Sequence, residues 1–196
     1  MVIVKNKSWI IGTLLMSILL SACSGGFEGN MERDLGEFSY QNQQNETVEL
    51  SDVEGTPTLV NFIFTNCDTV CPPMTFNMTE IQQAIEAEGI EDYRILSFSV
   101  DPENDSPEAL QEFMSSYSLN ERKWDFLTGY TQEEIIDFAM ESFQAIVADD
   151  PESDQVIHGT SFYLVDKEGT VVKNYDGISD VPIDEIVSDL KAVGDE

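Results

Sequence analysis

The sequence predicts one α/β domain in which a mixed β-sheet is covered by helices on both faces. Of the 196 residues, roughly 170 remain once an N-terminal export segment is set aside, which suits a single domain with its own core. Hydrophobic residues make up 41% of the chain, as in a packed protein. Strand-like runs alternate with helix-like patterns, and a late hairpin precedes a final helix, which together favour a layered α/β architecture.

The N-terminus has the pattern of an export signal. Lys5 and Lys7 precede the almost wholly apolar run from Ser8 to Leu20, which is short for a membrane span. The run ends in Leu20-Ser21-Ala22-Cys23, which resembles a bacterial lipobox. We therefore expect residues 1–22 to be a lipoprotein signal peptide and Cys23 to carry diacylglycerol. The alternatives are an ordinary cleaved signal and an uncleaved anchor helix.

A lipid on Cys23 would hold the domain at the outer face of the bacterial cytoplasmic membrane. Residues 23–36, rich in Gly, Asn and charge, are expected to form a flexible tether, and residues 37–196 the domain. Acylation of Cys23 leaves Cys67 and Cys71 as the two remaining cysteines. In an oxidising compartment such a pair forms a disulfide, binds a metal or does redox chemistry.

The first half of the domain begins with an expected hairpin, because residues 38–40 and 47–50 alternate polar and apolar around a polar turn. Residues 57–65 (PTLVNFIFT) are dense in apolar and β-branched side chains, which predicts a central strand buried on both faces. Pro72-Pro73 suits the first turn of a helix that continues to a stop at Gly89.

The second half repeats the alternation of strand and helix. Thr131 and Glu134 have the spacing of a capping box at a helix start. The expected elements are a buried strand at 93–100, a helix opened by Ser106-Pro107 with an apolar stripe reaching Tyr117, a short strand at 124–127, a helix from 131, a hairpin of 160–165 with 170–175, and a helix at 182–193. The acidic run 149–155 is expected to be a loop just ahead of His158.

Cys67 and Cys71 carry the clearest chemical signal. They follow the central strand at the mouth of a helix, where backbone N–H dipoles favour thiolate over thiol. Their spacing of four allows both sulfurs to meet one ion or to form a disulfide. A purely structural disulfide would stabilise little, since the gain grows with loop length.

His158 is the sole histidine of the chain and stands just before the strand TSFYLV. A lone His is more often structural than a ligand. The predicted order of strands and helices is of the thioredoxin type. In such a sheet the loop before this strand lies beside the cysteine loop, so His158 can approach both sulfurs. Two thiolates and one imidazole form a soft ligand set suited to Cu(I), with an open position for Cu(II). A structural zinc site would need a fourth ligand.

The net charge of the chain limits which classes of partner it can bind. The chain has 38 acidic and nine basic residues, a formal net charge of −29. Such a surface repels phosphate, so nucleic acid is excluded as a partner. It bears on solubility and encounter rates, and a solvated acidic surface suited to a saline or alkaline habitat is favoured over a dedicated acidic docking face.

These motifs together resemble the Sco (SenC) family of thioredoxin-fold copper proteins. The resemblance rests on Phe62-Ile63-Phe64-Thr65 leading into Cys67-Asp68-Thr69-Val70-Cys71-Pro72-Pro73-Met74, on the run Ser99 to Pro107 (SVDPENDSP), and on His158-Gly159. It covers most of residues 37–193, and CxxxCP with one distant His differs from the CxxC of ordinary thioredoxins.

The resemblance implies a copper metallochaperone that binds one copper ion, as Cu(I) or Cu(II), through Cys67, Cys71 and His158. The implied role is assembly of the dinuclear copper centre of cytochrome c oxidase, with the oxidase's copper-binding subunit and an upstream copper donor as partners. Asp101 and Asp105 are implied to support the site as neighbours of the ligands. Catalysis is not required for this role.

Two enzymatic alternatives stay open. One is a thiol-disulfide oxidoreductase that reduces the cysteines of the oxidase subunit, with Cys67 attacking and Cys71 resolving. The other is a thiol peroxidase, which is disfavoured because the acidic neighbours Asp68 and Glu80 do not activate a thiolate. Met74 and Met78 could act as soft auxiliary ligands, but their helical spacing favours core packing.

Overall fold

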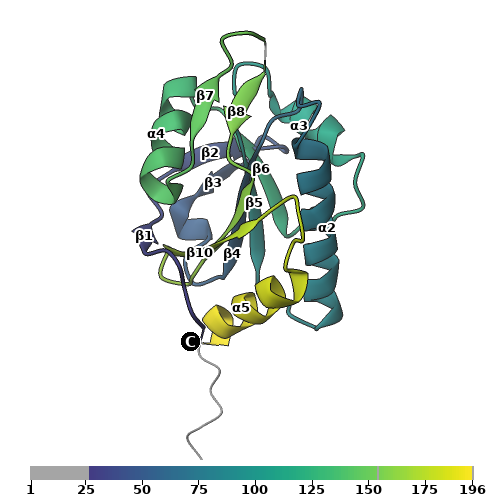
Figure 1. The fold of residues 1–196 in the computed structure, drawn as a ribbon, viewed down its shortest axis with the longest axis vertical. Helices are drawn as coiled ribbons and strands as arrows, with labels where there is room; N and C mark the ends of the chain where they lie inside the picture. The colour runs from purple at the N-terminus through teal and green to yellow at the C-terminus, as the bar shows by residue number, and fades with distance from the viewer. Residues whose placement is uncertain (1–26, 154, 196) are drawn as a thin grey trace, which may run out of the picture.

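The computed structural model describes residues 27–153 and 155–195 and confirms the α/β, thioredoxin-like prediction (Figure 1). The expected signal peptide and Cys23 lie outside these residues. Within the part of the chain that the structure describes, no helix is both long and apolar enough to cross a membrane.

The centre of the fold is an eight-stranded mixed sheet with the order β1-β10-β9-β4-β5-β6-β2-β3. The strand β4 pairs in parallel with β5, and β5 with β6, while the other pairs are antiparallel. The strands are β1 (Arg33–Asp34), β2 (Ser39–Asn42), β3 (Thr47–Glu49), β4 (Thr58–Ile63), β5 (Arg94–Ser99), β6 (Trp124–Thr128), β9 (Ser161–Val165) and β10 (Thr170–Asp176).

The predicted central strand is confirmed as β4, in which all six residues are buried. It lies between β5 and β9, so both of its edges are hydrogen-bonded. The expected entry hairpin is also confirmed, as β2 and β3, and it extends the sheet beyond β6. The site described below lies at the carboxyl end of β4, where its loop leads into a helix.

Among the described residues, four α-helices cover the sheet: α2 (Cys71–Ala87), α3 (Pro107–Met114), α4 (Gln132–Phe143) and α5 (Ile183–Asp195). Figure 1 shows α2 and α3 on one side of the sheet and α4 on the other, with α5 against α2. Aromatic contacts hold the helices against the sheet. The ring of Phe143 in α4 lies 5.3 Å from that of Phe62 in β4, whereas Phe113 in α3 lies 6.1 Å from Phe126 in β6.

The helix ends follow the sequence signals. Pro72 and Pro73 occupy the first turn of α2, where a missing N–H costs nothing, and Gly89 takes the positive φ of 73° that ends the helix region. In α4 the backbone N–H of Glu134 donates to Thr131 Oγ1 over 3.2 Å, and the Glu134 carboxylate accepts from the Thr131 N–H over 2.7 Å. The predicted capping box is therefore confirmed.

The helix predicted to start at Ser106-Pro107 is shorter than expected. Ser106 caps α3 as expected, but the helix ends at Met114 and does not reach Tyr117. Residues 115–117 form tight turns instead, in which the Tyr117 N–H donates to the Met114 carbonyl. Two polar residues, Ser115 and Ser116, favour such a turn over another helical turn. The rings of Phe113 and Tyr117 still lie 5.3 Å apart.

The structure differs from the sequence expectation at two further places. Residues 27–36, assigned above to the tether, run along β10: Asn30 and Met31 donate to the Val172 carbonyl, and Leu35 is buried. Asp149, expected in the acidic loop, and His158, expected in the loop before the last hairpin, belong instead to a separate two-stranded ribbon, β7 (Val147–Asp149) with β8 (Val156–His158). Strands of two or three residues carry too few alternations to be detected by periodicity.

Candidate metal centre

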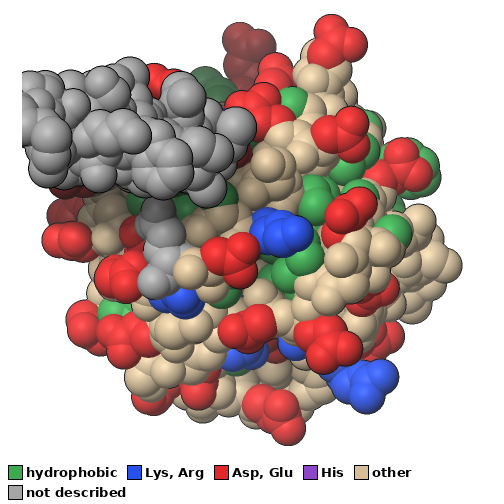
Figure 2. Space-filling model, turned by 90° about the horizontal axis from the view of Figure 1, so that it is seen from below, with side chains coloured by type: hydrophobic (Ala, Val, Ile, Leu, Met, Phe, Trp, Pro, Cys, Tyr) green, Lys and Arg blue, Asp and Glu red, His purple; other side chains and the backbone are tan. Residues whose placement is uncertain are grey.

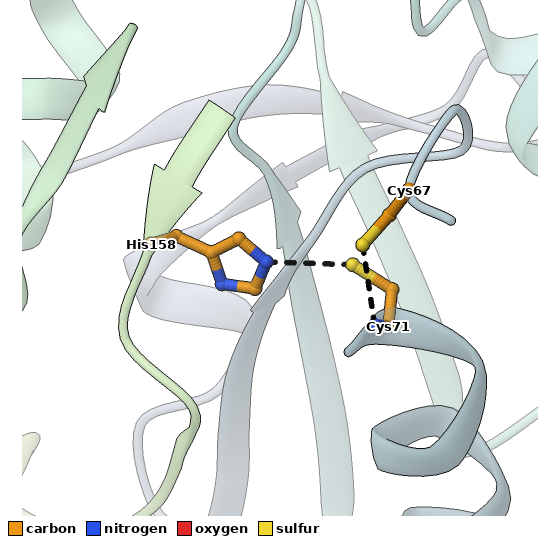
Figure 3. A group of neighbouring side chains, drawn as sticks. All are labelled: Cys67, Cys71 and His158. Atoms are coloured by element: carbon orange, nitrogen blue, oxygen red, sulfur yellow. Dashed lines mark hydrogen bonds between the residues drawn. The ribbon is translucent and has the colours of Figure 1, made fainter. Parts of the chain in front are cut away.

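The two cysteines lie where β4 gives way to α2 (Figure 3). Cys67 is in the connecting loop, and Cys71 is the first residue of the helix. The backbone N–H of Cys71, which has no partner within the helix, donates to Cys67 Sγ over 3.3 Å. Cys71 is fully buried, whereas Cys67 keeps 7% of its surface exposed, and both are free thiols.

His158 is the last residue of β8 and reaches the cysteines from the opposite side of the site (Figure 3). Its Nε2 lies 3.4 Å from Cys71 Sγ, and its Nδ1 lies 2.9 Å from the carbonyl oxygen of Gly159. A carbonyl oxygen only accepts hydrogen bonds, so Nδ1 is the protonated nitrogen. Nε2 is therefore the ring nitrogen that faces the sulfurs, which is the orientation that a metal ligand needs.

The sulfurs of Cys67 and Cys71 and a ring nitrogen of His158 all lie within 4.8 Å of one another. One ion could therefore contact all three atoms. The structure thus brings together three residues that are separated by up to 91 positions in the sequence (158 − 67). Their role as ligands follows from the chemistry of two soft sulfurs and one imidazole, which suits copper better than calcium or magnesium.

Hydrogen bonding makes the two thiols unequal. The S–H of Cys71 donates to Cys67 and, together with the backbone N–H groups of Cys71 and Thr69, holds the Cys67 pKa well below its usual range despite partial burial. The same hydrogen bond, with deeper burial, raises the pKa of Cys71. Cys67 is therefore the thiolate of the pair and Cys71 the thiol.

Asp105 supports the loop that carries Cys67 without touching the three residues of the site. Its buried carboxylate accepts from the Thr65 hydroxyl over 2.6 Å, from the Thr65 N–H over 3.2 Å and from the Ser99 hydroxyl over 2.6 Å. Burial raises the pKa of Asp105, although these donors oppose the shift. Asp101 accepts from the Asn104 side chain and so braces its own loop.

Several contributors to the site were not identified from the sequence. Phe64 places the edge of its ring against His158, with centroids 5.7 Å apart. Gly159 fixes the His158 tautomer through its carbonyl, and Gln155 donates to the Asn66 carbonyl over 3.0 Å, which links the ribbon to the cysteine loop. A backbone acceptor leaves no trace in residue type, so only the structure could reveal these links.

Met74 and Met78 were predicted to be core residues, and both are fully buried in the hydrophobic core. The structure places them on the inner face of α2 with Ile81 and Ile85.

Comparison with known proteins identifies the family. The SCO1/SenC family model matches residues 28–194. The SCO1 protein homolog of Bacillus subtilis (strain 168) is 48% identical over 179 residues, which cover 91% of this chain and 92% of that protein.

Solved structures similar to this chain come from the same family. BsSco, described as having a disulfide switch and as a member of the Sco family of cytochrome c oxidase assembly proteins, is 48% identical with a TM-score of 0.80, covering 86% of this chain and 98% of that one. A SCO1/SenC family lipoprotein from Bacillus anthracis str. Ames is 42% identical with a TM-score of 0.79 (82% and 95% covered). ScoI of Bradyrhizobium japonicum with copper bound is 26% identical with a TM-score of 0.67 (80% and 96% covered).

Proposed function

Because this chain belongs to the SCO1/SenC family, we propose that it binds one copper ion through Cys67, Cys71 and His158 and acts in the assembly of cytochrome c oxidase. The observation that carries the proposal is the set of three donor atoms within 4.8 Å of one another. A relative of 26% identity has been solved with copper bound, and one of 48% identity is described as a member of an oxidase assembly family.

The residues present fit copper. Cys67 is already a thiolate, so its sulfur can bind a cation without first losing a proton. Nδ1 of His158 donates to the Gly159 carbonyl, so Nε2 is the ring nitrogen that faces the sulfurs and would bind the ion. Sulfur and imidazole are the ligands that Cu(I) prefers, and they also accept Cu(II).

Copper is the cargo in this proposal. An upstream donor loads the site, and the loaded protein gives its copper to the oxidase subunit that houses the dinuclear copper centre. Transfer by ligand exchange suits a site with only three protein ligands, since a fourth position stays open for an incoming ligand. Of the two sulfurs, Cys67, with 7% of its surface exposed, is the more accessible to an incoming ligand.

The proposed location is the outer face of the cytoplasmic membrane, with Cys23 as the lipid-anchored residue after removal of residues 1–22. The Leu20-Ser21-Ala22-Cys23 motif supports this, and the Bacillus anthracis relative is described as a lipoprotein. Residues after Cys23 would then lead into the copper-binding domain, which includes the segment from residue 27 that runs along β10.

A second candidate function is thiol-disulfide exchange, which the inequality of the two thiols favours. The Cys67 thiolate would attack a disulfide of the oxidase subunit, and Cys71 would then displace the mixed disulfide. The substrate gains two electrons as a dithiol, and this chain keeps a Cys67–Cys71 disulfide that another thiol must reduce. This reaction needs both cysteines and no imidazole.

His158 therefore separates the two functions. In cells that lack the chromosomal copy, His158→Ala should abolish oxidase assembly if copper transfer is the function, and should support assembly if thiol exchange suffices. The Cys67→Ser variant is the reference for complete loss under both functions. Assembly by His158→Ala chains that hold no copper would overturn the metallochaperone proposal.

A further inference from the structure

The ribbon that carries His158 stands apart from the main sheet. Within the described residues, β7 and β8 pair only with each other, with Val147 directly opposite His158. Val147 is buried, and His158 points at Cys71, so this face of the ribbon is turned towards the site. The ribbon lies over the site, and the face turned towards the cysteines carries His158, one of the three proposed ligands.

The outer face of the ribbon is apolar and exposed. Side chains alternate along a strand, so Ala148 and Ile157 lie on the face opposite to His158. Ile146 directly precedes β7, and the hydrogen bond from the Gly159 N–H to its carbonyl extends the pairing by one residue and puts Ile146 on the same face. Ile157 pairs directly with Ala148 and is a diagonal neighbour of Ile146. We call these three side chains the outer ribbon face.

Exposure of this kind is rare in the molecule. The structure has four exposed large hydrophobic side chains among its described residues: Phe76, Met140, Ile146 and Ile157. The outer ribbon face holds two of them, with 62% of Ile146 and 51% of Ile157 exposed. Isolated exposed hydrophobics are ordinary, but two adjacent ones on the cover of a reactive site mark a contact surface.

Charge is unevenly distributed around this face. Asp149, Asp150 and Glu152 form the exposed or half-buried tip of the ribbon, and Asp68 lies between the two cysteines. The basic residues among those described lie in β1, at the starts of β5 and β6, around the β9–β10 turn, in β10 and in α5: Arg33, Arg94, Arg122, Lys123, Lys167, Lys173 and Lys191. The end of the molecule away from the ribbon, seen in Figure 2, shows lysine and arginine among the acidic side chains.

We propose that the outer ribbon face and the acidic tip together form the docking surface for the oxidase subunit that receives copper from this chain, and that this partner offers an apolar centre bordered by basic side chains. The inference rests on the proposed function and adds the chemistry of the partner to it. Because Ile157 and His158 are consecutive, a partner seated on the outer ribbon face contacts the strand that holds the imidazole ligand. Docking and access to the copper site are thereby coupled.

Other occupants fit less well. An anionic membrane surface would be repelled by the tip, and a second copy placed ribbon to ribbon would oppose acid with acid. A basic rim on a protein partner instead gains from the charge of the tip, while the two isoleucines supply apolar area at the centre.

The test uses the full chain in detergent and the purified, metal-free extracytoplasmic domain of the oxidase's copper-binding subunit from the same organism. The test variant is Ile146→Thr/Ile157→Thr, because threonine keeps the β-branch that suits a strand and removes the apolar surface. Phe76→Ser, which removes an exposed hydrophobic from α2, is the matched control. Asp149→Asn/Glu152→Gln tests the tip.

The double Thr variant should bind the partner at least about tenfold more weakly, and Phe76→Ser as tightly as the unmodified chain. The tip variant should lose most of the salt dependence of binding. Copper uptake by the double Thr variant should remain at one equivalent, which separates this proposal from the proposed function. Four results would each overturn the proposed docking surface. The double Thr variant could bind with unchanged affinity, Phe76→Ser could lose as much affinity, or the unmodified chain could fail to bind. A dimer of this chain that the Thr substitutions dissociate is the fourth.

Discussion

The inequality of the two thiols leads to a quantitative prediction about Cys67. Cys71 contributes the largest stabilising hydrogen bond to the Cys67 thiolate. Replacing Cys71 with alanine removes this donor, whereas replacing it with serine keeps an O–H at nearly the same place. We therefore expect the Cys67 pKa to be higher in Cys71→Ala than in Cys71→Ser, in the reduced and metal-free chain.

The size of the difference follows from the hydrogen bond. A hydrogen bond to a charged group contributes about 1.5–3 kcal/mol, which corresponds to roughly 1–2 pKa units. The absolute pKa of Cys67 can be tested as well. An ordinary thiol, with a pKa of 9.0, changes its ionised fraction roughly 300-fold between about pH 5.5 and pH 8. Cys67 in the unmodified chain should change little over this interval, because it is already ionised.

Two assays measure this. Thiolate absorbance near 240 nm gives the Cys67 midpoint in each Cys71 variant of a chain that starts after Cys23, and mass spectrometry of the iodoacetamide-treated protein gives the rate at Cys67 and at buried Cys71. Far-UV circular dichroism at each pH restricts the comparison to folded protein. The reasoning would be refuted by a Cys67 midpoint of 8 to 9 in the unmodified chain, or by equal midpoints in Cys71→Ala and Cys71→Ser.

Three further predictions concern stability. Asp105→Ala should lower the free energy of unfolding by about 3 kcal/mol, because the Thr65 N–H, the Thr65 hydroxyl and the Ser99 hydroxyl lose their acceptor; a loss below about 1 kcal/mol in urea denaturation would contradict this. Burial raises the pKa of Asp105 above 3.8, so the stabilising contribution of Asp105 to folding is full below pH 3.8 and is lost as the pH rises through the raised value. Asp105→Asn should remove this decline in stability with pH. Parallel stability–pH profiles of the variant and the unmodified chain would count against it. Copper at about a thousandfold above its Kd should stabilise the chain by about 4 kcal/mol, and His158→Ala should show a much smaller gain in the same thermal unfolding assay.

The sequence was sufficient for the parts of the site that depend on local pattern. A buried strand followed by Cys67, Cys71 and two prolines places both sulfurs at a helix start, and the structure has them there. The position of His158 required one further step, from the order of strands to a shared edge of the sheet. That step succeeded because the topology leaves few arrangements for the last hairpin.

Features that depend on distant partners could not be predicted from the sequence. Asp105 and Thr65 are 40 residues apart, and nothing in either residue type specifies their hydrogen bonds. The ribbon of β7 and β8 has three residues in each strand, too few for a periodic signal, and β1 has two. The tautomer of His158 depends on the Gly159 carbonyl, which every residue type possesses.

The central claim is that Cys67, Cys71 and His158 bind one copper ion together. An anaerobic copper titration of the reduced chain, followed by absorption and EPR spectroscopy of the copper-loaded form, tests it most directly when His158→Ala is titrated alongside. We predict one tight equivalent of copper with sulfur-to-copper charge transfer, lost or strongly weakened in the variant. Weak binding, or tight binding that is the same without His158, would contradict it.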